Sequence, residues 1–504
     1  MFKRVYGCRD GQSQTCMVPK TEKEPVHLKP EPPAKRRGID LYVSQYYCLK
    51  QKGHIMSVIA FPKQASVFQP VAHYIRLGET SYRKVADLAA AGVIKSKRFV
   101  VDGSKIGFQK DIIQVLQGLG AEIVLDPRTI ELSARRKCAG LAASAPWAPE
   151  TRGVPLAPDV FRDRHPTDIY GAIARCAVKH GVSAVLSPSH YLADPSFEGW
   201  QTIDHDACML LRRALDSEGG KSIAIDYLVA ARLTDFMDES FQSKMMPNLS
   251  DLPYDNLWVR ASMSKALGPV NAQRLVRTLS RWHNIGKPIV MDYMGGLSAE
   301  SLAAMNVVSG VAHGFGEQTS FTTSKWAEPP EERDKDKRGG RATRIGVSSL
   351  GCTFTSAELD VLMSAHGAKS ALLPNDRRVL PNGVEDIRRD PRRFNVYDAQ
   401  RRMEEINAIP TANRPDHFAD KRMREVVATA NKAAKLNPKA EIAEAKNVDL
   451  KKLRARLVKF STASEKLRGT YENLAQERTE QGATVRAIGD LRRSTPLNQT
   501  GTER

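Results

Sequence analysis

Paired cysteines are missing from this sequence, although the chain contains seven cysteines. They lie singly and form no Cys-x-x-Cys motif, at Cys8, Cys16, Cys48, Cys138, Cys176, Cys208 and Cys352. An odd number of scattered cysteines argues against a disulfide framework and against a zinc ribbon. Such cysteine usage suits a reducing compartment, so we predict a cytoplasmic location.

Long apolar runs are also missing. No stretch of about 18 uncharged apolar residues occurs, and the first residues, MFKR, are not followed by an apolar segment. We therefore predict neither a signal peptide nor contact with a membrane. No Gly-x-Gly-x-x-Gly motif follows the first predicted strand, which counts against a dinucleotide-binding open sheet.

Positive charge is abundant. The chain has 504 residues, 76 Lys and Arg against 57 Asp and Glu, and a formal net charge of +19. This excess favours a polyanionic partner such as nucleic acid or a nucleotide, and the alternative is a basic, solvated surface without a partner. Hydrophobic residues make up 41% of the chain, which is enough for a substantial core.

Eight short apolar runs each end in a polar side chain. The end residues are Asp102, Asp126, Ser187, Asp226, Arg260, Asp292, His313 and Ser348. Most of the intervals are long enough for one helix, and strands that alternate with helices form parallel sheets. We predict an α/β fold, a (β/α)8 TIM-like barrel, with a doubly wound open sheet as the alternative.

The composition divides the chain into five parts. We predict a disordered basic, Pro-rich arm over 1–38, a small α/β extension over 39–97, and the barrel over 98–375. Within the extension, 54–61 is a predicted strand, and 67–74 and 82–91 are predicted helices. An Arg-rich connection with a helix follows over 376–424, and then a helical basic tail over 425–504. Apolar residues recur every three or four positions from Leu450 onward, which favours self-association through these helices.

Carboxylates and histidines at the predicted strand ends are the catalytic candidates. The C-terminal ends of barrel strands converge, so Asp126, Asp226 and Asp292, with Asp102, are expected to share one rim. Clustered carboxylates acquire different pKa values and can act as acid, base or nucleophile. Their oxygens also suit Mg²⁺, although no metal-binding motif is present, and capping of turns is the alternative role. His190 and His313 are candidates for proton transfer.

Cations and glycines near the same ends are the substrate-binding candidates. Lys105, Arg128 and Arg260 suit a phosphate or carboxylate, and pairing with the aspartates is the alternative. Glycine-rich loops follow the predicted sixth and seventh strands, with Gly295, Gly296, Gly314 and Gly316. Glycine lets the backbone approach an anion closely, so these loops are predicted phosphate contacts, or else tight turns.

Four segments resemble those of an uncharacterised bacterial and phage-associated family labelled beta protein. They are LDPRT (125–129), LSPSHYL (186–192), PIVMDYMGG (288–296) and GVAHGFG (310–316), and the resemblance spans about Arg98 to Arg424. It implies no established activity. A looser similarity, to tRNA-guanine transglycosylase-type barrels, implies chemistry on a base or glycosidic bond. The chain departs from that pattern because it lacks the cysteine-rich zinc site and has no Asp after Val311.

These patterns support two hypotheses. The first is an enzyme that acts on a phosphate-bearing, nucleotide or nucleic-acid-like substrate, with glycosidic or phosphoester cleavage or transfer by strand-end carboxylates. The second is a non-catalytic scaffold of a mobile-element or phage-defence system that binds nucleic acid or protein. In that case four Arg pairs between 377 and 402 and the basic tail would neutralise phosphates.

Overall fold

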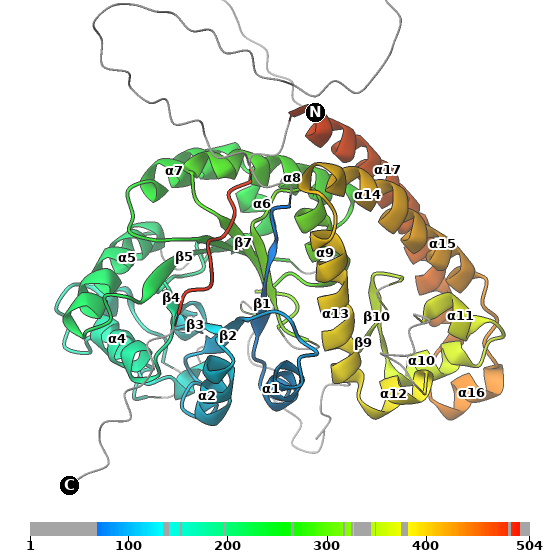
Figure 1. Ribbon diagram of the computed structural model, residues 1–504, viewed down its shortest axis with the longest axis horizontal. Helices are drawn as coiled ribbons and strands as arrows, with labels where there is room; N and C mark the ends of the chain where they lie inside the picture. Colours follow the sequence, from blue (N-terminus) through cyan, green and yellow to red (C-terminus); the bar gives the residue numbers. More distant parts are fainter. Residues whose placement is uncertain are drawn as a thin grey trace, which may run out of the picture. The chain divides into compact units, whose positions relative to one another are not determined.

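Eight parallel strands form a closed barrel in chain order, so the predicted TIM-like fold is confirmed (Figure 1). The computed structural model describes residues 68–134, 141–151, 154–194, 198–263, 267–315, 318–323, 326, 344–347, 349–373, 382–481 and 485–493. The barrel strands are β1 Ala72–Arg76, β2 Arg98–Asp102, β3 Glu122–Asp126, β4 Ala184–Leu186, β5 Ala224–Arg232, β6 Leu257–Ser262, β7 Ile289–Asp292 and β8 Gly310–His313. Pairing of β8 with β1, His313 opposite Ile75, closes the barrel.

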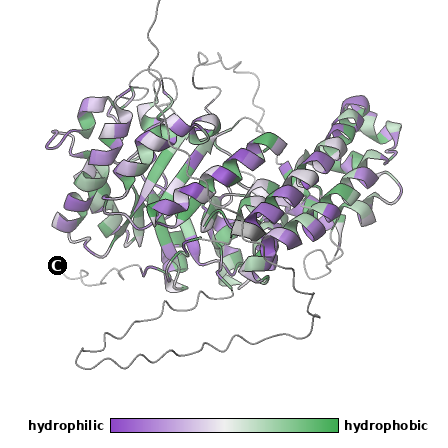
Figure 2. Cartoon of the chain, turned by 90° about the horizontal axis from the view of Figure 1, so that it is seen from above, coloured by the Kyte–Doolittle hydropathy of each residue, from purple (hydrophilic) through white to green (hydrophobic). Residues whose placement is uncertain are grey.

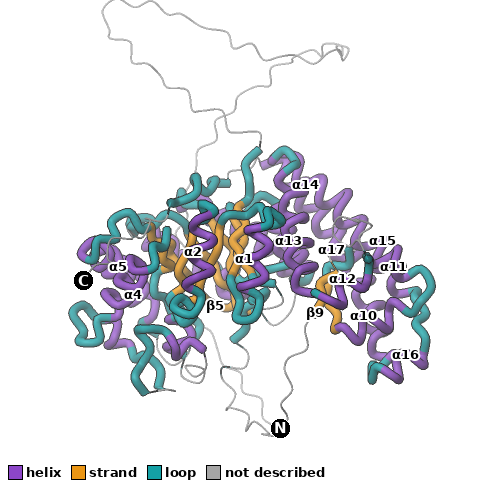
Figure 3. The backbone as a smooth tube through the Cα atoms, turned by 60° about the horizontal axis from the view of Figure 1, so that its bottom comes forward, coloured by secondary structure: helices purple, strands orange, loops and turns teal. Residues whose placement is uncertain are grey.

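Helices surround these strands (Figure 3). They are α1 Tyr82–Ala90, α2 Lys110–Gly118, α3 Thr129–Ser133, α4 Ile169–Lys179, α5 Trp200–Ser217, α6 Leu233–Phe236, α7 Glu239–Leu249, α8 Pro269–Trp282 and α9 Gly296–Ala304. α8 illustrates their pattern, since Leu275, Val276 and Leu279 are buried against the barrel while Arg281 is exposed. The strands are largely apolar and the helices are apolar on one side (Figure 2).

The barrel begins one strand earlier than we predicted. Residues 67–74 were predicted to be helical, but 72–76 form β1, so α1 and β1 belong to the barrel and not to an extension. Tyr74 faces the barrel interior and Ile75 faces the surrounding helices. In so short a run, apolar residues fit a helical period and a strand period equally well. We predicted the helix, and the structure has the strand. The predicted strand 54–61 and the arm 1–38 lie outside the described residues.

The predicted eighth strand is not part of the barrel. Arg344–Val347 forms β9, which pairs antiparallel with β10, Cys352–Thr355, in a separate two-stranded sheet. The barrel therefore ends at His313 and not near 375. The apolar run at 344–347 packs into a second hydrophobic core, with Phe354, Leu359 and Leu362. Ser348 lies outside the described residues.

A helical region follows the hairpin, as predicted. Its helices are α10 Ser356–Met363, α11 Ala368–Leu372, α12 Val384–Arg389, α13 Pro391–Asn407, α14 Arg414–His417, α15 Met423–Ala434, α16 Ala440–Ala445 and α17 Leu450–Gln481. Residues Phe418–Arg422 form a π-helical turn between α14 and α15. α13 contacts α9 and α17 contacts α8, and Arg422 Nε lies 2.7 Å from Glu300 Oε2 on α9. In the described chain, no helix combines the length and the apolar character that a bilayer span requires.

The last described segment, 485–493, lies against the N-terminal ends of the strands. Ser309 donates a hydrogen bond to the carbonyl oxygen of Arg486, and Arg98 donates one to that of Gly489. Ile488 reaches the barrel interior so closely that a Cβ at Gly310 would lie 2.9 Å from its Cδ1. This segment, red in Figure 1, therefore closes the N-terminal end of the barrel.

Candidate functional site

Charged side chains from five strands converge at the C-terminal end of the barrel. Arg76 ends β1, Asp102 ends β2, Asp126 ends β3, Arg260 lies on β6 and Asp292 ends β7. Asp102 is in register with Asp126, and Arg260 with Asp292, so the barrel closure itself brings these residues together. We call these five residues the mouth cluster.

Two arginines bridge the aspartates of the mouth cluster. Arg76 donates from Nε to Asp292 Oδ1 at 2.7 Å, from Nη2 to Asp126 Oδ2 at 3.0 Å, and from Nη1 to Asp102 Oδ1 at 3.4 Å. Arg260 donates from Nε to Asp292 Oδ2 at 2.8 Å and from Nη2 to Asp126 Oδ2 at 2.6 Å. Both arginine side chains are 0% exposed, so charge-assisted hydrogen bonds compensate their burial.

A second group of residues surrounds the solvent side of the mouth cluster. Arg128 lies 3.3 Å from Asp102 and 2.9 Å from Glu131, and it donates a hydrogen bond to the hydroxyl of Tyr293. The Tyr293 ring lies 4.2 Å from the guanidinium carbon of Arg76, a cation–π contact. Gln318 Nε2 donates to Asp102 Oδ2 at 2.7 Å. The side chains of Arg128 and Asp102 are 18% and 12% exposed, so this group marks the path from solvent to the cluster.

Burial and neighbouring charges shift two carboxyl groups in opposite directions. Burial alone would raise the pKa of Asp126, but the guanidinium groups of Arg260 and Arg76 outweigh it and hold that pKa well below its usual range. At Glu131 burial prevails over the attraction of Arg128, and it raises the pKa of that carboxyl. The site therefore contains one carboxylate that stays ionised and one carboxyl group that more readily holds a proton.

Three buried polar atoms near the cluster have no hydrogen-bond partner among the described residues. They are Arg260 Nη1, Glu131 Oε2 and Gln318 Oε1. An unpaired buried donor or acceptor costs about 1–3 kcal/mol. A ligand that accepts a hydrogen bond from Arg260 and one from a protonated Glu131 would satisfy the first two.

The sequence-predicted residues divide into two groups. Asp126, Asp292 and Arg260, with Arg128 beside them, are brought together as expected. Asp226 is not, so the expectation that it shares their rim is wrong. It lies four residues before Ala230, the β5 residue that is in register with Arg260. Its carboxylate accepts hydrogen bonds in the N-terminal half of the barrel, from Trp258 Nε1 at 3.0 Å and Asn256 Nδ2 at 2.9 Å.

The two predicted histidines lie outside the barrel interior. His190 stacks on Trp200 with ring centroids 3.7 Å apart, and its Nδ1 lies 2.5 Å from Asp204 Oδ1. Burial and the neighbouring His313 lower the pKa of His73, whose ring centroid lies 4.9 Å from that of His313. The Lys105 side chain pairs with Glu79 at 3.0 Å, and the contact of Lys105 with the mouth cluster is a hydrogen bond from its backbone N–H to the carbonyl oxygen of Asp102.

The glycine-rich loops follow β7 and β8, one strand later than we counted. Gly295 precedes α9 and lies against the ring of His313, and Gly296 has a φ of +62°. Met294 pairs with Ser320, so the two loops touch. Gly314 N–H donates to the carbonyl oxygen of Gln318, while Gly316 lies outside the described residues. Loops after the seventh and eighth strands commonly bind phosphate in this fold.

Sequence reasoning missed four residues of the site: Arg76, Glu131, Tyr293 and Gln318. Arg76 was missed because its strand was predicted as a helix. The rule that found the other strand ends, an apolar run closed by a polar residue, fits only the last three residues of 72–76, because His73 interrupts the run. No sequence signal marks Glu131, because its raised pKa arises from burial beside a guanidinium group.

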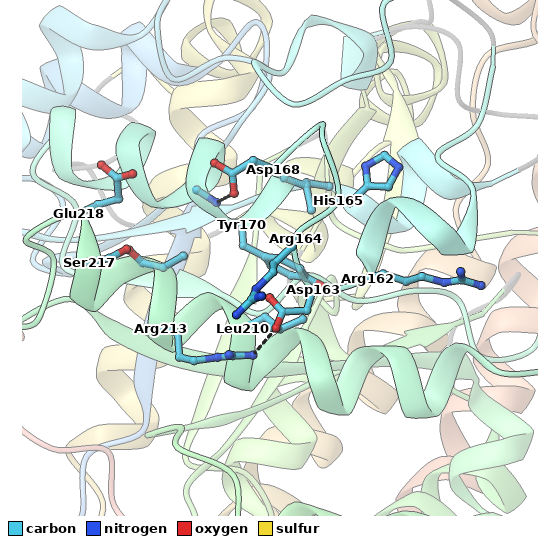
Figure 4. A pocket seen from close by; sticks show the side chains of 13 residues that line it. Arg162, Asp163, Arg164, His165, Asp168, Tyr170, Leu210, Arg213, Ser217 and Glu218 are labelled. Carbon is cyan, nitrogen blue, oxygen red and sulfur yellow. Dashed lines mark hydrogen bonds and ion pairs between the residues drawn. The ribbon is translucent and has the colours of Figure 1, made fainter.

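The structure also contains a cavity of about 330 Å³ on the outer wall of the barrel (Figure 4). Residues of α4 and α5 and of the loop before α4 line it, and these include Arg162, Asp163, Arg164, His165, Asp168, Tyr170, Leu210, Arg213, Ser217 and Glu218. Arg213 pairs with Asp163 at 3.4 Å across it. None of these side chains comes from a strand end, so the cavity is separate from the mouth cluster.

The described residues contain no group of three or more His, Cys, Asp or Glu side chains arranged to hold a metal ion. The carboxylates of the mouth cluster already have guanidinium groups as counter-ions, so Mg²⁺ would have to compete with them. No family model and no curated protein matches this chain, so the two resemblances remain predictions.

Proposed function

We propose that the chain is a TIM-barrel enzyme that acts on a phosphate-bearing, nucleotide or nucleic-acid-like substrate at the mouth cluster. The observation that carries the proposal is the opposite pKa shift of Asp126 and Glu131 within one arginine-lined site. Environments that separate the pKa values of two carboxyl groups create a proton donor and an ionised partner.

The carboxyl groups have distinct roles in this proposal. Glu131, with its raised pKa, donates a proton to the leaving oxygen of a glycosidic or phosphoester bond. Asp102, the most exposed aspartate of the cluster, is the base or nucleophile once Gln318 releases it. Arg128 contacts both carboxyl groups, Asp102 through Nη1 and Glu131 through Nη2. Asp126 remains ionised, and Asp126 and Asp292 together position Arg76 and Arg260.

The substrate phosphate is bound by a guanidinium group and by backbone N–H groups. Arg260 Nη1 supplies an unpaired donor, and Gly295 and Gly296 supply backbone that an anion can approach closely, while the Gly314 N–H already donates to Gln318. The two glycine loops touch each other beyond β7 and β8, so both can contact one phosphate. Tyr293 and Phe321, whose rings lie 6.0 Å apart, form an aromatic wall beside it.

Ligand-induced thermal shifts followed by turnover assays test the proposal. Nucleotides, sugar phosphates, RNA and DNA are screened with and without Mg²⁺ against the wild type, Glu131→Gln and Asp102→Asn. We expect one phosphate-bearing class to stabilise all three proteins, with turnover lowered about 10²–10⁴-fold in Glu131→Gln. Glu441→Gln, at an exposed position on α16, is the matched control. Ligand shifts and turnover unaffected by both site variants would exclude the mouth cluster as the active site.

Three arginines of the Arg pairs give the alternative, a nucleic-acid-binding scaffold, little support. Arg388 lies 2.7 Å from Asp360, Arg401 lies 3.0 Å from Asp398, and Arg402 lies 3.4 Å from Glu425. These arginines already have acidic partners within the chain. Arg377 and Arg378 lie outside the described residues.

A further inference from the structure

The helical region carries a concentration of positive charge. Between residues 421 and 459, all described, the chain has twelve Lys and Arg against four Asp and Glu, a net charge of +8. Five of the exposed basic side chains lie on α15, on α17 and on the segment that joins α15 to α16. They form what we call the basic face, Lys432, Lys435, Lys439, Lys451 and Arg454.

Contacts between α15 and α17 bring these side chains together. Asn431 Nδ2 on α15 donates to Glu465 Oε1 on α17 at 3.1 Å. Arg454 on α17 donates to Asn437 Oδ1, just after α15. The two helices are therefore antiparallel, and the start of α17 lies beside the end of α15. Lys435 and Lys439 flank Asn437, and Lys451 lies one helical turn before Arg454, so four of the five positive charges surround this single contact.

The basic face differs from its neighbours because its charge is not neutralised. Nearby, Arg456 pairs with Glu358 at 2.8 Å and Lys446 with Asp360 at 2.9 Å. In the described chain, no ion pair joins the five residues of the basic face to a carboxylate, and the partner of Arg454 is a neutral amide. Uncompensated positive charge on neighbouring helices raises the local concentration of polyanions.

We propose that the basic face binds the phosphate backbone of duplex nucleic acid without reading its sequence. Single strands are bound through stacking of bases on exposed aromatic rings, and the exposed large hydrophobic residues on α15–α17 include no aromatic ring. Insertion into a membrane requires several exposed apolar side chains, and among the described residues of these helices Val458, 53% exposed, stands alone. Duplex phosphates need only the cations that the basic face supplies.

Fluorescence anisotropy of a labelled 24-base-pair duplex with the full chain, over a series of salt concentrations, tests this inference. The variant carries Lys435→Glu, Lys451→Glu and Arg454→Glu. We expect affinity to fall at least 10-fold and the slope of log K against log salt to become shallower by about 3, because each lost phosphate contact removes about one unit. The matched control carries Lys110→Glu, Lys221→Glu and Lys244→Glu, exposed positions on the barrel with the same change in charge.

Each outcome decides the inference. Weak binding by the variant with near wild-type binding by the control supports it. Equal losses in both proteins would mean that net charge, and not the basic face, attracts the duplex, and would overturn it. Tighter binding to a single strand of the same length, or to anionic lipid vesicles, would also overturn it. No residue of the mouth cluster is changed, so failure here leaves the proposed enzymatic function intact.

Discussion

The two ends of the barrel interior both contain buried carboxylates, but they are neutralised in different ways. At the C-terminal end, Arg76 and Arg260 on the barrel strands themselves neutralise Asp126 and Asp292. At the N-terminal end, Arg492 lies 2.6 Å from Glu122 and 2.8 Å from Asp226, and Arg98 on β2 lies 3.3 Å from Glu122, so the guanidinium group that pairs with Asp226 comes from outside the strands. Arg492 lies 266 residues after Asp226, on the segment that follows α17.

The charges at the C-terminal end belong to the barrel strands themselves, whereas a segment outside the strands closes the N-terminal end. Guanidinium groups on strands are fixed by the barrel ladder, so the C-terminal end holds its charges in place before any ligand arrives. The N-terminal end depends in part on Arg492, on a segment that is not one of the barrel strands. In this fold the C-terminal end usually carries chemistry and the N-terminal end stability. Asp226, with Glu122, therefore serves to anchor the segment 485–493.

Removal of Arg76 is expected to have the largest effect. In Arg76→Met, Asp292 and Asp126 lose hydrogen bonds while they remain buried, and breaking a buried ion pair on one side costs about 3–5 kcal/mol. Urea denaturation at pH 7 measures the change in unfolding free energy. Arg281→Met, at a position whose side chain is 60% exposed, should change it by less than about 0.5 kcal/mol. If Arg76→Met lost as little unfolding free energy as Arg281→Met, water would have to enter the mouth cluster freely.

Removal of Arg492 is expected to cost less. Its side chain is 18% exposed, so water can reach Glu122 and Asp226 once the guanidinium group is gone, and we expect Arg492→Ala to cost about 1–3 kcal/mol. In a double-mutant cycle with Asp226→Asn, the combined loss should be smaller than the sum of the single losses. Additive losses would show that Arg492 does not act through Asp226.

The comparison also shows how far the sequence predicts the structure. The strand ends Asp126, Asp292 and Arg260 were found because an apolar run closed by a polar residue is a local pattern. The same pattern wrongly predicted that Asp226 lies at the C-terminal rim of the barrel. Strand β5 is long, and Asp226 is its third residue, not its last. The polar residue ended the apparent run but not the strand.

Other features depend on contacts that no local pattern contains. Arg492 was assigned to a helical basic tail and not to the barrel, because its partners, Glu122 and Asp226, lie hundreds of residues earlier. Similarly, β9 was counted as a barrel strand because an apolar run of four residues has the same composition in a barrel and in a hairpin. Pairing partners decide between the two, and those are set by the tertiary fold.

Low pH should reduce the stability that Asp126 contributes at the C-terminal end of the barrel. Its pKa is lowered in the folded state, so its contribution to stability is fully present above the ordinary value of 3.8 and is lost as the pH falls below it. The difference in unfolding free energy between the wild type and Asp126→Asn should therefore be largest near pH 6 and shrink toward pH 3. Guanidinium chloride denaturation at pH 6, 4.5 and 3 measures it. A constant difference over this range would contradict the lowered pKa.

The smallest effect is expected at Glu131, with the opposite dependence on pH. Its pKa is raised in the folded state, so its contribution to stability is present below the ordinary value of 4.5 and is lost as the pH rises. Glu131→Gln should match the wild type at pH 4 and exceed it at pH 8 by less than about 1 kcal/mol. Glu300→Gln, which removes the buried partner of Arg422, should instead destabilise the protein at both values of pH. If Glu131→Gln lost stability at pH 8, Glu131 would be an ionised structural partner of Arg128, and the proton donor of the proposed reaction would have to lie elsewhere.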